Sequence, residues 1–339
     1  MPRPTTPKPS LKDVAATAGV SAPTVSRILN NRSEGFSVRP EVRDRVVAVA
    51  RELSYRPHLL AQSLRKKSMR IVGMLGVHVP IVLPDDAIRG MVEVFEARGV
   101  KLSTYFSPTI EASHDLPPWR IDGALVAGVL KPSDTRALEK ARLPYVSING
   151  WAGPSGGSVN YDDADGARQA LRHLLELGHR RIAYANAAGP WRTHPSVRVR
   201  HDNYCAVLAA AGLSPVAGHD QPWDEDDAAA SLRAWRAEGV TAVLVYQHFQ
   251  AIKLMHAAYA QGCVPPHDLS IVCFNDEYIG QMMYPALTAV GLPTGLAGRT
   301  AAAMLMRRLD AAGATAPPPE SVLLPPKLVV RGSTAPPRR

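Results

Sequence analysis

The sequence is poor in cysteine and lacks long hydrophobic runs. Only Cys205, Cys263 and Cys273 occur among 339 residues, and none belongs to a CxxC pair. An odd number of thiols without that spacing argues against a disulfide scaffold and a zinc ribbon. No apolar stretch reaches the ~18 residues that a membrane helix needs, and residues 1–10 lack the apolar core of a secretory signal. These absences predict a protein of the reducing cytoplasm that has no membrane partner.

Motifs of nucleotide and zinc chemistry are missing as well. The chain contains no GxGxxG, GxxxxGK[ST] or HExxH, and its eleven histidines are scattered. Gly153–Gly157 matches GxSxG, but a nucleophile elbow requires a strand before the serine and a helix after it. The acidic run at 224–227 suits a helix N-terminus better than a cation site. We therefore expect a protein that is not an enzyme, with no catalytic residues, no cofactor and no metal site.

Positive charge is concentrated at the N-terminal end. Residues 1–70 hold 14 Lys and Arg against 5 Asp and Glu, a net charge of +9 that equals the net charge of the whole chain. A basic module joined to a neutral body is typical of a protein that binds a polyanion with one part. On charge alone, a solvated basic face remains the alternative.

Residues 11–30 have the pattern of two helices joined by a tight turn. Leu11–Ala18 is expected to be a short helix that Gly19 ends, and Ala22–Asn30 a second helix that Ser21 caps. Two helices joined in this way form the helix-turn-helix motif, whose second helix enters the DNA major groove. The residues expected to face DNA there are Ser21, Ala22, Pro23, Thr24, Ser26 and Arg27.

Two further segments complete the basic module. Pro40–Leu53 carries an apolar stripe at helical spacing and is predicted to be a third helix. The stretch Pro57–Lys67 has a helix-like start but is too short to be a stable helix alone. We expect it to become ordered only against a partner.

These segments resemble the LacI family of bacterial transcription regulators. The resemblance is carried by Leu11–Ala15, Gly19–Ser21, Thr24–Arg27, Tyr55–Pro57 and Ala61–Leu64. It implies that the short segment is a hinge helix, which folds on operator DNA and pairs with that of a dimer mate. By resemblance, His58 and Ala61 contact DNA and Leu64 is the apolar wedge that kinks the duplex.

The basic module departs from the family pattern in two places. The loop Asn31–Val38 is about three residues longer than usual, and His58 stands where the family has Asn. Ala22 and Pro23 offer no side-chain hydrogen bonds and can contact only thymine methyls or the shape of the groove. Specificity is therefore expected to depend on Thr24, Ser26, Arg27 and DNA deformability.

From Arg70 onward, strand and helix patterns alternate. Buried-strand runs such as Ile71–Leu75 and Tyr145–Ile148 are separated by amphipathic helices such as Asp163–Leu177 and Arg200–Ala211. Alternating βα units predict parallel sheets, which bind ligands beyond the carboxyl ends of their strands. The expected fold class is an all-α helix-turn-helix headpiece plus an α/β effector domain of two doubly wound parallel-sheet lobes.

The body also resembles the LacI family, through Gly166–Arg168, His173–Ala183, Leu287–Val290 and Leu328–Thr334. This implies a periplasmic-binding-protein-like core that senses a small effector between its lobes. The positions expected to contact the effector are Asn149, Arg200, Trp223, Gln247 and Asn275, with Trp223 suited to stack on a sugar face. Gln247-His248 and Asn275 replace residues that are more acidic in the family, which predicts a cleft poorer in carboxylates and makes a simple hexose a less certain effector.

The resulting hypothesis is a cytoplasmic, nucleoid-associated homodimeric repressor. It would bind near-palindromic double-stranded operator DNA under the control of a small-molecule effector, such as a sugar or a related metabolite. A regulator that needs no ligand, and a sugar-binding protein with an incidental basic arm, remain alternatives. The expected boundaries are a tail at 1–10, the DNA-binding domain at 11–56, the hinge and linker at 57–69, the core at 70–334 and a tail at 335–339, with one lobe at 70–160 plus 293–318 and the other at 161–290 plus 319–332.

Overall fold

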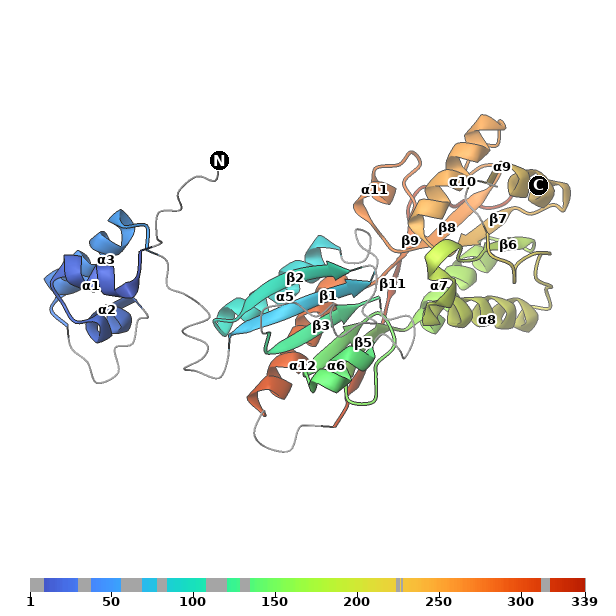
Figure 1. Cartoon of the computed structure of the whole chain (residues 1–339). Coiled ribbons are helices and arrows are strands. Elements are labelled where there is room, and N and C mark those ends of the chain that lie inside the picture. The colour runs from blue at the N-terminus through green and yellow to red at the C-terminus, as the bar shows by residue number, and fades with distance from the viewer. Residues whose placement is uncertain are drawn as a thin grey trace, which may run out of the picture. The chain divides into compact units, whose positions relative to one another are not determined.

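The chain divides into two compact units, Met1–Met69 and Arg70–Arg339 (Figure 1). A computed structural model describes residues 9–29, 38–55, 69–77, 84–107, 121–128, 135–223, 226, 228–311 and 318–338. The predicted hinge residues His58, Ala61 and Leu64 lie outside these ranges, as does nearly all of the lengthened loop.

The first unit contains three helices within its described residues, α1 (Leu11–Ala18), α2 (Ala22–Leu29) and α3 (Pro40–Glu52). Val14, Val25 and Val46, one from each helix, are fully buried against one another. This small apolar core fixes the crossing of α1 and α2, because each helix presents its apolar side inward. The helix-turn-helix prediction is confirmed.

Local signals set the ends of these helices. Ser10 and Asp13 form a capping box at the start of α1, in which the Ser10 N–H donates to the Asp13 carboxylate at 2.7 Å. Gly19 ends α1 with a φ of 64°, a left-handed conformation that glycine adopts without strain. Arg45 of α3 donates its Nε–H to the Ala18 carbonyl at 3.0 Å and so ties α3 to the end of α1.

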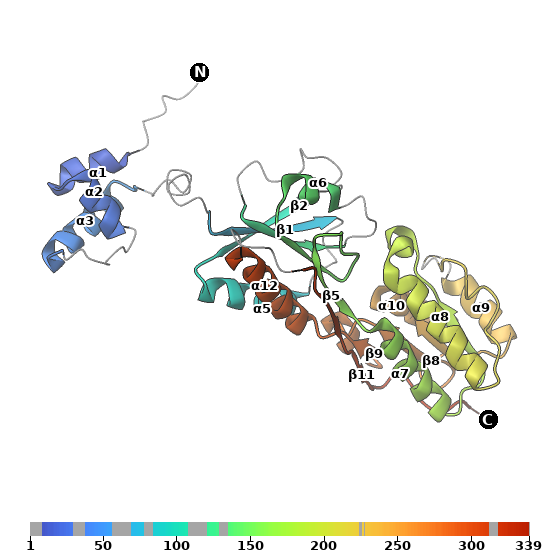
Figure 2. The same ribbon diagram turned by 90° about the horizontal axis from the view of Figure 1, so that it is seen from below.

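The first lobe of the second unit is built on a parallel sheet in the order β10-β5-β4-β3-β1-β2. Alternate side chains enter two separate apolar clusters, as the period of two in a strand requires. Helices α5 and α12 cover one face, and α6 covers the other (Figures 1 and 2). The elements are β1 (Ile71–Val77), α5 (Asp85–Ala97), β2 (Lys101–Ser107), β3 (Gly123–Ala127), α6 (Arg136–Ala141), β4 (Tyr145–Ile148), β5 (Gly157–Tyr161), α12 (Thr294–Asp310) and β10 (Ser321–Leu324).

The second lobe has a sheet in the order β11-β9-β8-β7-β6, parallel except for the β11–β9 pair. Helices α7 and α8 pack on one face, and α9 and α10 on the other. The elements are α7 (Asp163–Glu176), β6 (Ile182–Ala185), η2 (Gly189–Thr193), α8 (Pro195–Ala210), α9 (Ala228–Ala237), β7 (Ala242–Val245), α10 (His248–Ala260), β8 (Ser270–Phe274), α11 (Tyr278–Gln281), β9 (Thr288–Gly291) and β11 (Lys327–Val329). The predicted fold class, a helical headpiece plus two doubly wound α/β lobes, is confirmed.

One boundary inferred from the sequence is wrong. Residues 319–332 were assigned together to the second lobe, but β10 pairs with β5 in the first sheet, with Val322 opposite Val159. Only β11, three residues further along, joins the second sheet. The chain therefore crosses between the lobes at residues 325–326, because each of these short strands completes a different sheet edge. Within the described part of the chain, no helix is long and apolar enough to cross a membrane.

Candidate functional site

Of the residues expected to face DNA, Ser21 directly precedes α2 and the others lie on it, where Ala22 also packs against the apolar core that contains Val25 and Ile28. Ser21 caps the helix by accepting the Thr24 N–H at 3.3 Å, and the two hydroxyls are 2.8 Å apart. This bond fixes the direction of both hydroxyls. Pro23 and Arg27 are exposed, while Ala22, Thr24 and Ser26 are partly exposed.

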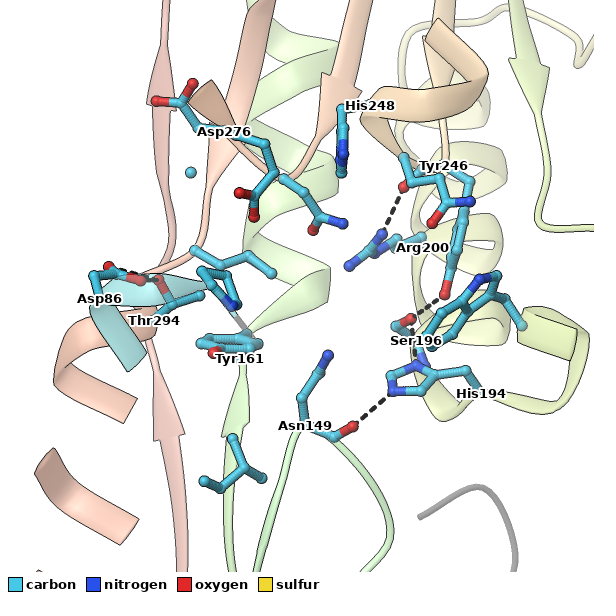
Figure 3. Close-up of a pocket in the computed structure, with 18 of the residues that line it drawn as sticks. Asp86, Asn149, Tyr161, His194, Ser196, Arg200, Tyr246, His248, Asp276 and Thr294 are labelled. Carbon is cyan, nitrogen blue, oxygen red and sulfur yellow. Dashed lines mark hydrogen bonds between the residues drawn. The ribbon is translucent and has the colours of Figure 1, made fainter. Parts of the chain in front are cut away.

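A cavity of about 400 Å³ lies between the two lobes, beyond the carboxyl ends of strands from both sheets (Figure 3). Asn149 directly follows β4, Gln247 lies two residues beyond β7, and Asn275 directly follows β8. Asn149 and Asn275 adopt positive φ values of 50° and 69°, a conformation that Asn tolerates better than most residues. Parallel strands place these polar side chains at one edge of each sheet.

Arg200 of α8 is at the second-lobe side of the cavity and is almost completely buried. Its Nε–H donates to Asp163 at 2.7 Å, and its Nη1–H donates to the Tyr246 carbonyl at 2.7 Å. Its guanidinium carbon lies 3.8 Å from the centroid of the Phe274 ring. Burial alone would lower the pKa of Arg200, but the charge of Asp163 raises it, so the guanidinium remains charged.

A hydrogen-bond chain through His194 connects the lobes (Figure 3). His194 Nε2 donates to the Asn149 carbonyl of the first lobe at 2.8 Å. This leaves His194 Nδ1 as an acceptor for the Ser196 hydroxyl at 2.7 Å, and Tyr246 completes the chain through its hydroxyl at 2.8 Å from Ser196. Burial lowers the pKa of His194, which favours the neutral imidazole that this arrangement requires.

The cavity contains carboxylates at positions other than Gln247, His248 and Asn275. Asp86, Asp276 and Glu277 all line it. Asp86 accepts hydrogen bonds from the Thr294 hydroxyl and the Gly295 N–H, and Asp276 pairs with Arg331 at 2.6 Å. Burial, followed by the negative charges of Asp86 and Asp276, raises the pKa of Glu277. The sequence comparison concerned only Gln247, His248 and Asn275, and neighbouring positions supply these carboxylates.

His248, at the first turn of α10, also lines the cavity. It is 5% exposed, and its Nδ1 has no hydrogen-bond partner among the described residues. Burial lowers its pKa to about 4, so the ring is neutral at neutral pH. The Nδ1 atom itself is buried.

Of the five predicted effector contacts, Asn149, Arg200, Gln247 and Asn275 line the cavity. Trp223 does not, and the expectation that it stacks on a ligand is not supported. Its ring stacks instead on Trp235 at a centroid distance of 6.0 Å, inside the core under α9 and α10.

The tryptophan that does line the cavity is Trp191, in the 3-10 helix η2 just before α8. Sequence analysis missed it, together with His194 and Ser196, because α8 was predicted to begin at Arg200. The helix begins at Pro195, a residue suited to the first helical position, and this proline was the available signal.

Comparison with known proteins gives consistent results for both units. Residues 10–58 match the lacI family of bacterial regulatory proteins, and residues 171–334 match the periplasmic binding protein-like domain. The HTH-type transcriptional regulator CelR of Thermobifida fusca is 31% identical over 340 residues, covering 93% of this chain and 96% of that protein. The chain belongs to the LacI family of bacterial regulatory proteins.

Other members of the LacI family are similar to this chain over nearly its whole length. The lactose operon repressor of Escherichia coli (strain K12) is 28% identical, covering 97% of this chain and 91% of that protein. The crystal structure of the lac repressor dimer bound to operator and the anti-inducer ONPF aligns with a TM-score of 0.79 at 27% identity, covering 97% of this chain and 100% of that chain. A CelR–cellobiose complex aligns with a TM-score of 0.67 at 26% identity, covering 96% and 99% of the two chains.

Proposed function

We propose that this LacI-family regulator is a homodimeric transcriptional repressor. Its affinity for the operator is raised or lowered by a polyhydroxylated small molecule. The observation that carries the proposal is the cavity, because both lobes line it and a ligand within it contacts both. A ligand that binds one arrangement of the lobes more tightly shifts the population toward that arrangement. By linkage, effector and operator then alter each other's affinity by the same factor.

The basic module supports DNA binding. Its net charge of +9 supplies the electrostatic attraction to phosphates. Arg27 is exposed on α2 and suits bidentate bonding to guanine, while Ala22 and Pro23 suit contact with thymine methyls. The relative whose crystal structure is a dimer on its operator supports a homodimer that reads a near-palindromic site.

The lining of the cavity supports a sugar-like effector. Asp86, Asp276 and Glu277 supply strong hydroxyl acceptors, and Asn149 and Gln247 supply amides that both donate and accept. Trp191 offers an aromatic face for the apolar side of a sugar ring. The CelR–cellobiose complex, a relative with a bound disaccharide, is consistent with this class.

Selection of DNA from a random pool at fixed salt tests the operator proposal. We expect a near-palindromic sequence that binds at least about a thousandfold more tightly than unrelated DNA. Arg27→Ala should weaken specific binding, and so should Leu64→Ala if the hinge prediction is correct. Arg136→Ala removes an equal charge from an exposed site on the second unit and should leave specific binding unchanged. Recovery of nonspecific binding alone would exclude operator recognition.

A thermal-shift screen with sugars and sugar acids, followed by titration on operator-bound protein, tests the effector proposal. The effector should change operator affinity, and Trp191→Phe should weaken effector binding. Trp235→Phe, in the core and away from the cavity, should leave the affinity for the effector unchanged. A screen in which no compound alters operator affinity would favour the ligand-independent regulator. Repression itself is tested by transcription from a promoter that carries the selected site.

A further inference from the structure

Three metal-ligating side chains meet on the second lobe at a place separate from the cavity. His201 Nε2 lies 2.8 Å from His219 Nδ1, and Cys205 Sγ lies 3.7 Å and 3.8 Å from these two nitrogens. All three side chains are partly buried, and their ligand atoms lie within 4.8 Å of one another. None of the three residues lines the cavity between the lobes.

Helix α8 holds two of these ligands side by side. His201 and Cys205 are four residues apart on α8, so their side chains lie on the same face of the helix. This is the i, i+4 spacing that lets two helical side chains share one ion.

The loop after α8 brings in the third ligand, His219. The Val216 N–H donates to the Tyr204 hydroxyl at 3.2 Å, and the His219 N–H donates to the Val216 carbonyl at 3.3 Å. Tyr204 is itself fully buried and donates its hydroxyl to the Ile182 carbonyl at 2.9 Å. The loop is therefore anchored next to Cys205 before any ion binds.

The spacing is close to that of a zinc site. Tetrahedral Zn²⁺, with bonds of about 2.0–2.1 Å to nitrogen and about 2.3 Å to sulfur, separates nitrogen from sulfur by about 3.6 Å and nitrogen from nitrogen by about 3.3 Å. The two sulfur–nitrogen distances already match. Only the histidine pair must open, by about 0.5 Å, because its nitrogens now share a hydrogen bond.

The surroundings of His201 favour the correct tautomer. Its Nδ1 faces the Asp202 carboxylate at 3.5 Å, while its Nε2 faces the other two ligands. A carboxylate beside the second ring nitrogen is the usual support for a metal-bound histidine, because it keeps the proton away from the ligating nitrogen.

We propose that His201, Cys205 and His219 bind one Zn²⁺ ion, with a water molecule as the fourth ligand. On binding, the Cys205 thiol loses its proton to solvent and the hydrogen bond between the histidines is replaced by two metal–nitrogen bonds. One thiolate with two imidazoles is a borderline-soft ligand set that suits zinc rather than magnesium or calcium. The ion links the loop to α8, the helix that carries Arg200 into the effector cavity.

Cobalt substitution in tag-free, full-length protein tests the ligand set. After treatment with a chelator, one equivalent of Co²⁺ should give the visible bands of tetrahedral cobalt and a near-ultraviolet thiolate-to-cobalt band, and Zn²⁺ should displace it. Cys205→Ser should abolish the near-ultraviolet band, and His219→Gln should weaken binding at least about 10–100-fold. His267→Gln, an exposed histidine elsewhere on the lobe, is the matched control and should change neither.

Thiol labelling of the wild type gives a second measurement that needs no variant. Cys205 is the partly exposed cysteine, whereas Cys263 and Cys273 are buried. Stoichiometric Zn²⁺ should therefore slow the reaction of the single accessible thiol, and a chelator should restore it. Three results would each overturn the proposal. The protein could fail to bind one equivalent of metal, binding could survive both Cys205→Ser and His219→Gln, or Zn²⁺ could fail to protect the thiol. None of these results bears on operator binding, so the two proposals fail independently.

Discussion

Replacement of Arg200 by methionine should destabilise the second lobe strongly. Arg200 and Asp163 are 3% and 11% exposed at their side chains, so the substitution leaves a carboxylate buried without its cation. Breaking a buried ion pair from one side costs about 3–5 kcal/mol, because the remaining charge has lost its partner but not its burial. The same substitution also removes the donor to the Tyr246 carbonyl.

A double-mutant cycle separates the ion pair from other losses. Asp163→Asn alone should also be destabilising, and the double variant should lose less than the sum of the two, with a coupling of about 1–3 kcal/mol. Urea unfolding of the full chain, followed by tryptophan fluorescence to which Trp223 and Trp235 in the second-lobe core contribute, measures each free energy of unfolding.

The neighbouring Arg198 provides the control on the same helix. Its pair with Asp202 is exposed, at 90% and 58% of the two side chains, so Arg198→Ala should leave the unfolding midpoint unchanged. A loss of unfolding free energy below about 1 kcal/mol for Arg200→Met would refute the claim that a buried ion pair between Arg200 and Asp163 stabilises the second lobe. Strictly additive effects in the cycle would refute it as well.

Three further predictions concern burial and close packing. Because burial lowers the pKa of His248 from an ordinary 6.5 to about 4, the unfolded chain binds a proton first as the pH falls. About 2–3 kcal/mol of stability should be lost between those values, and His248→Gln should flatten that part of the profile of unfolding free energy against pH; parallel profiles would contradict this. Gly298→Ala would place a Cβ 2.1 Å from the Ala87 carbonyl oxygen, so α5 and α12 must separate at a cost of about 1–3 kcal/mol in urea unfolding, and an unchanged midpoint would show that they do not pack as described. Tyr204→Phe removes the hydroxyl that bonds Ile182 and Val216 and should cost about 1–2 kcal/mol by the same assay; a neutral effect would mean that water replaces it.

Sequence alone determined the features that depend on neighbours along the chain. The turn at Gly19, the cap at Ser21 and the strand Tyr145–Ile148 were predicted at the residues where the structure has them. Caps, glycine turns and apolar periodicity act over one or two helical turns, so their physical basis is present in the local sequence. The alternation of strands and helices was sufficient to predict parallel sheets, and with them a cleft at the carboxyl ends of the strands.

Only the tertiary structure decided which strands are neighbours and which side chains meet. β10 and β11 are four and three residues long and lie close together in sequence, yet each completes a different sheet, because pairing depends on the free edge that each lobe presents. Trp223 and Trp191 have the same chemistry, but one packs in the core and the other faces the cavity. The meeting of His219 with His201 and Cys205 likewise depends on the fold of a loop. Such contacts join residues far apart in sequence, and their energy comes from burial and geometry that no local pattern contains.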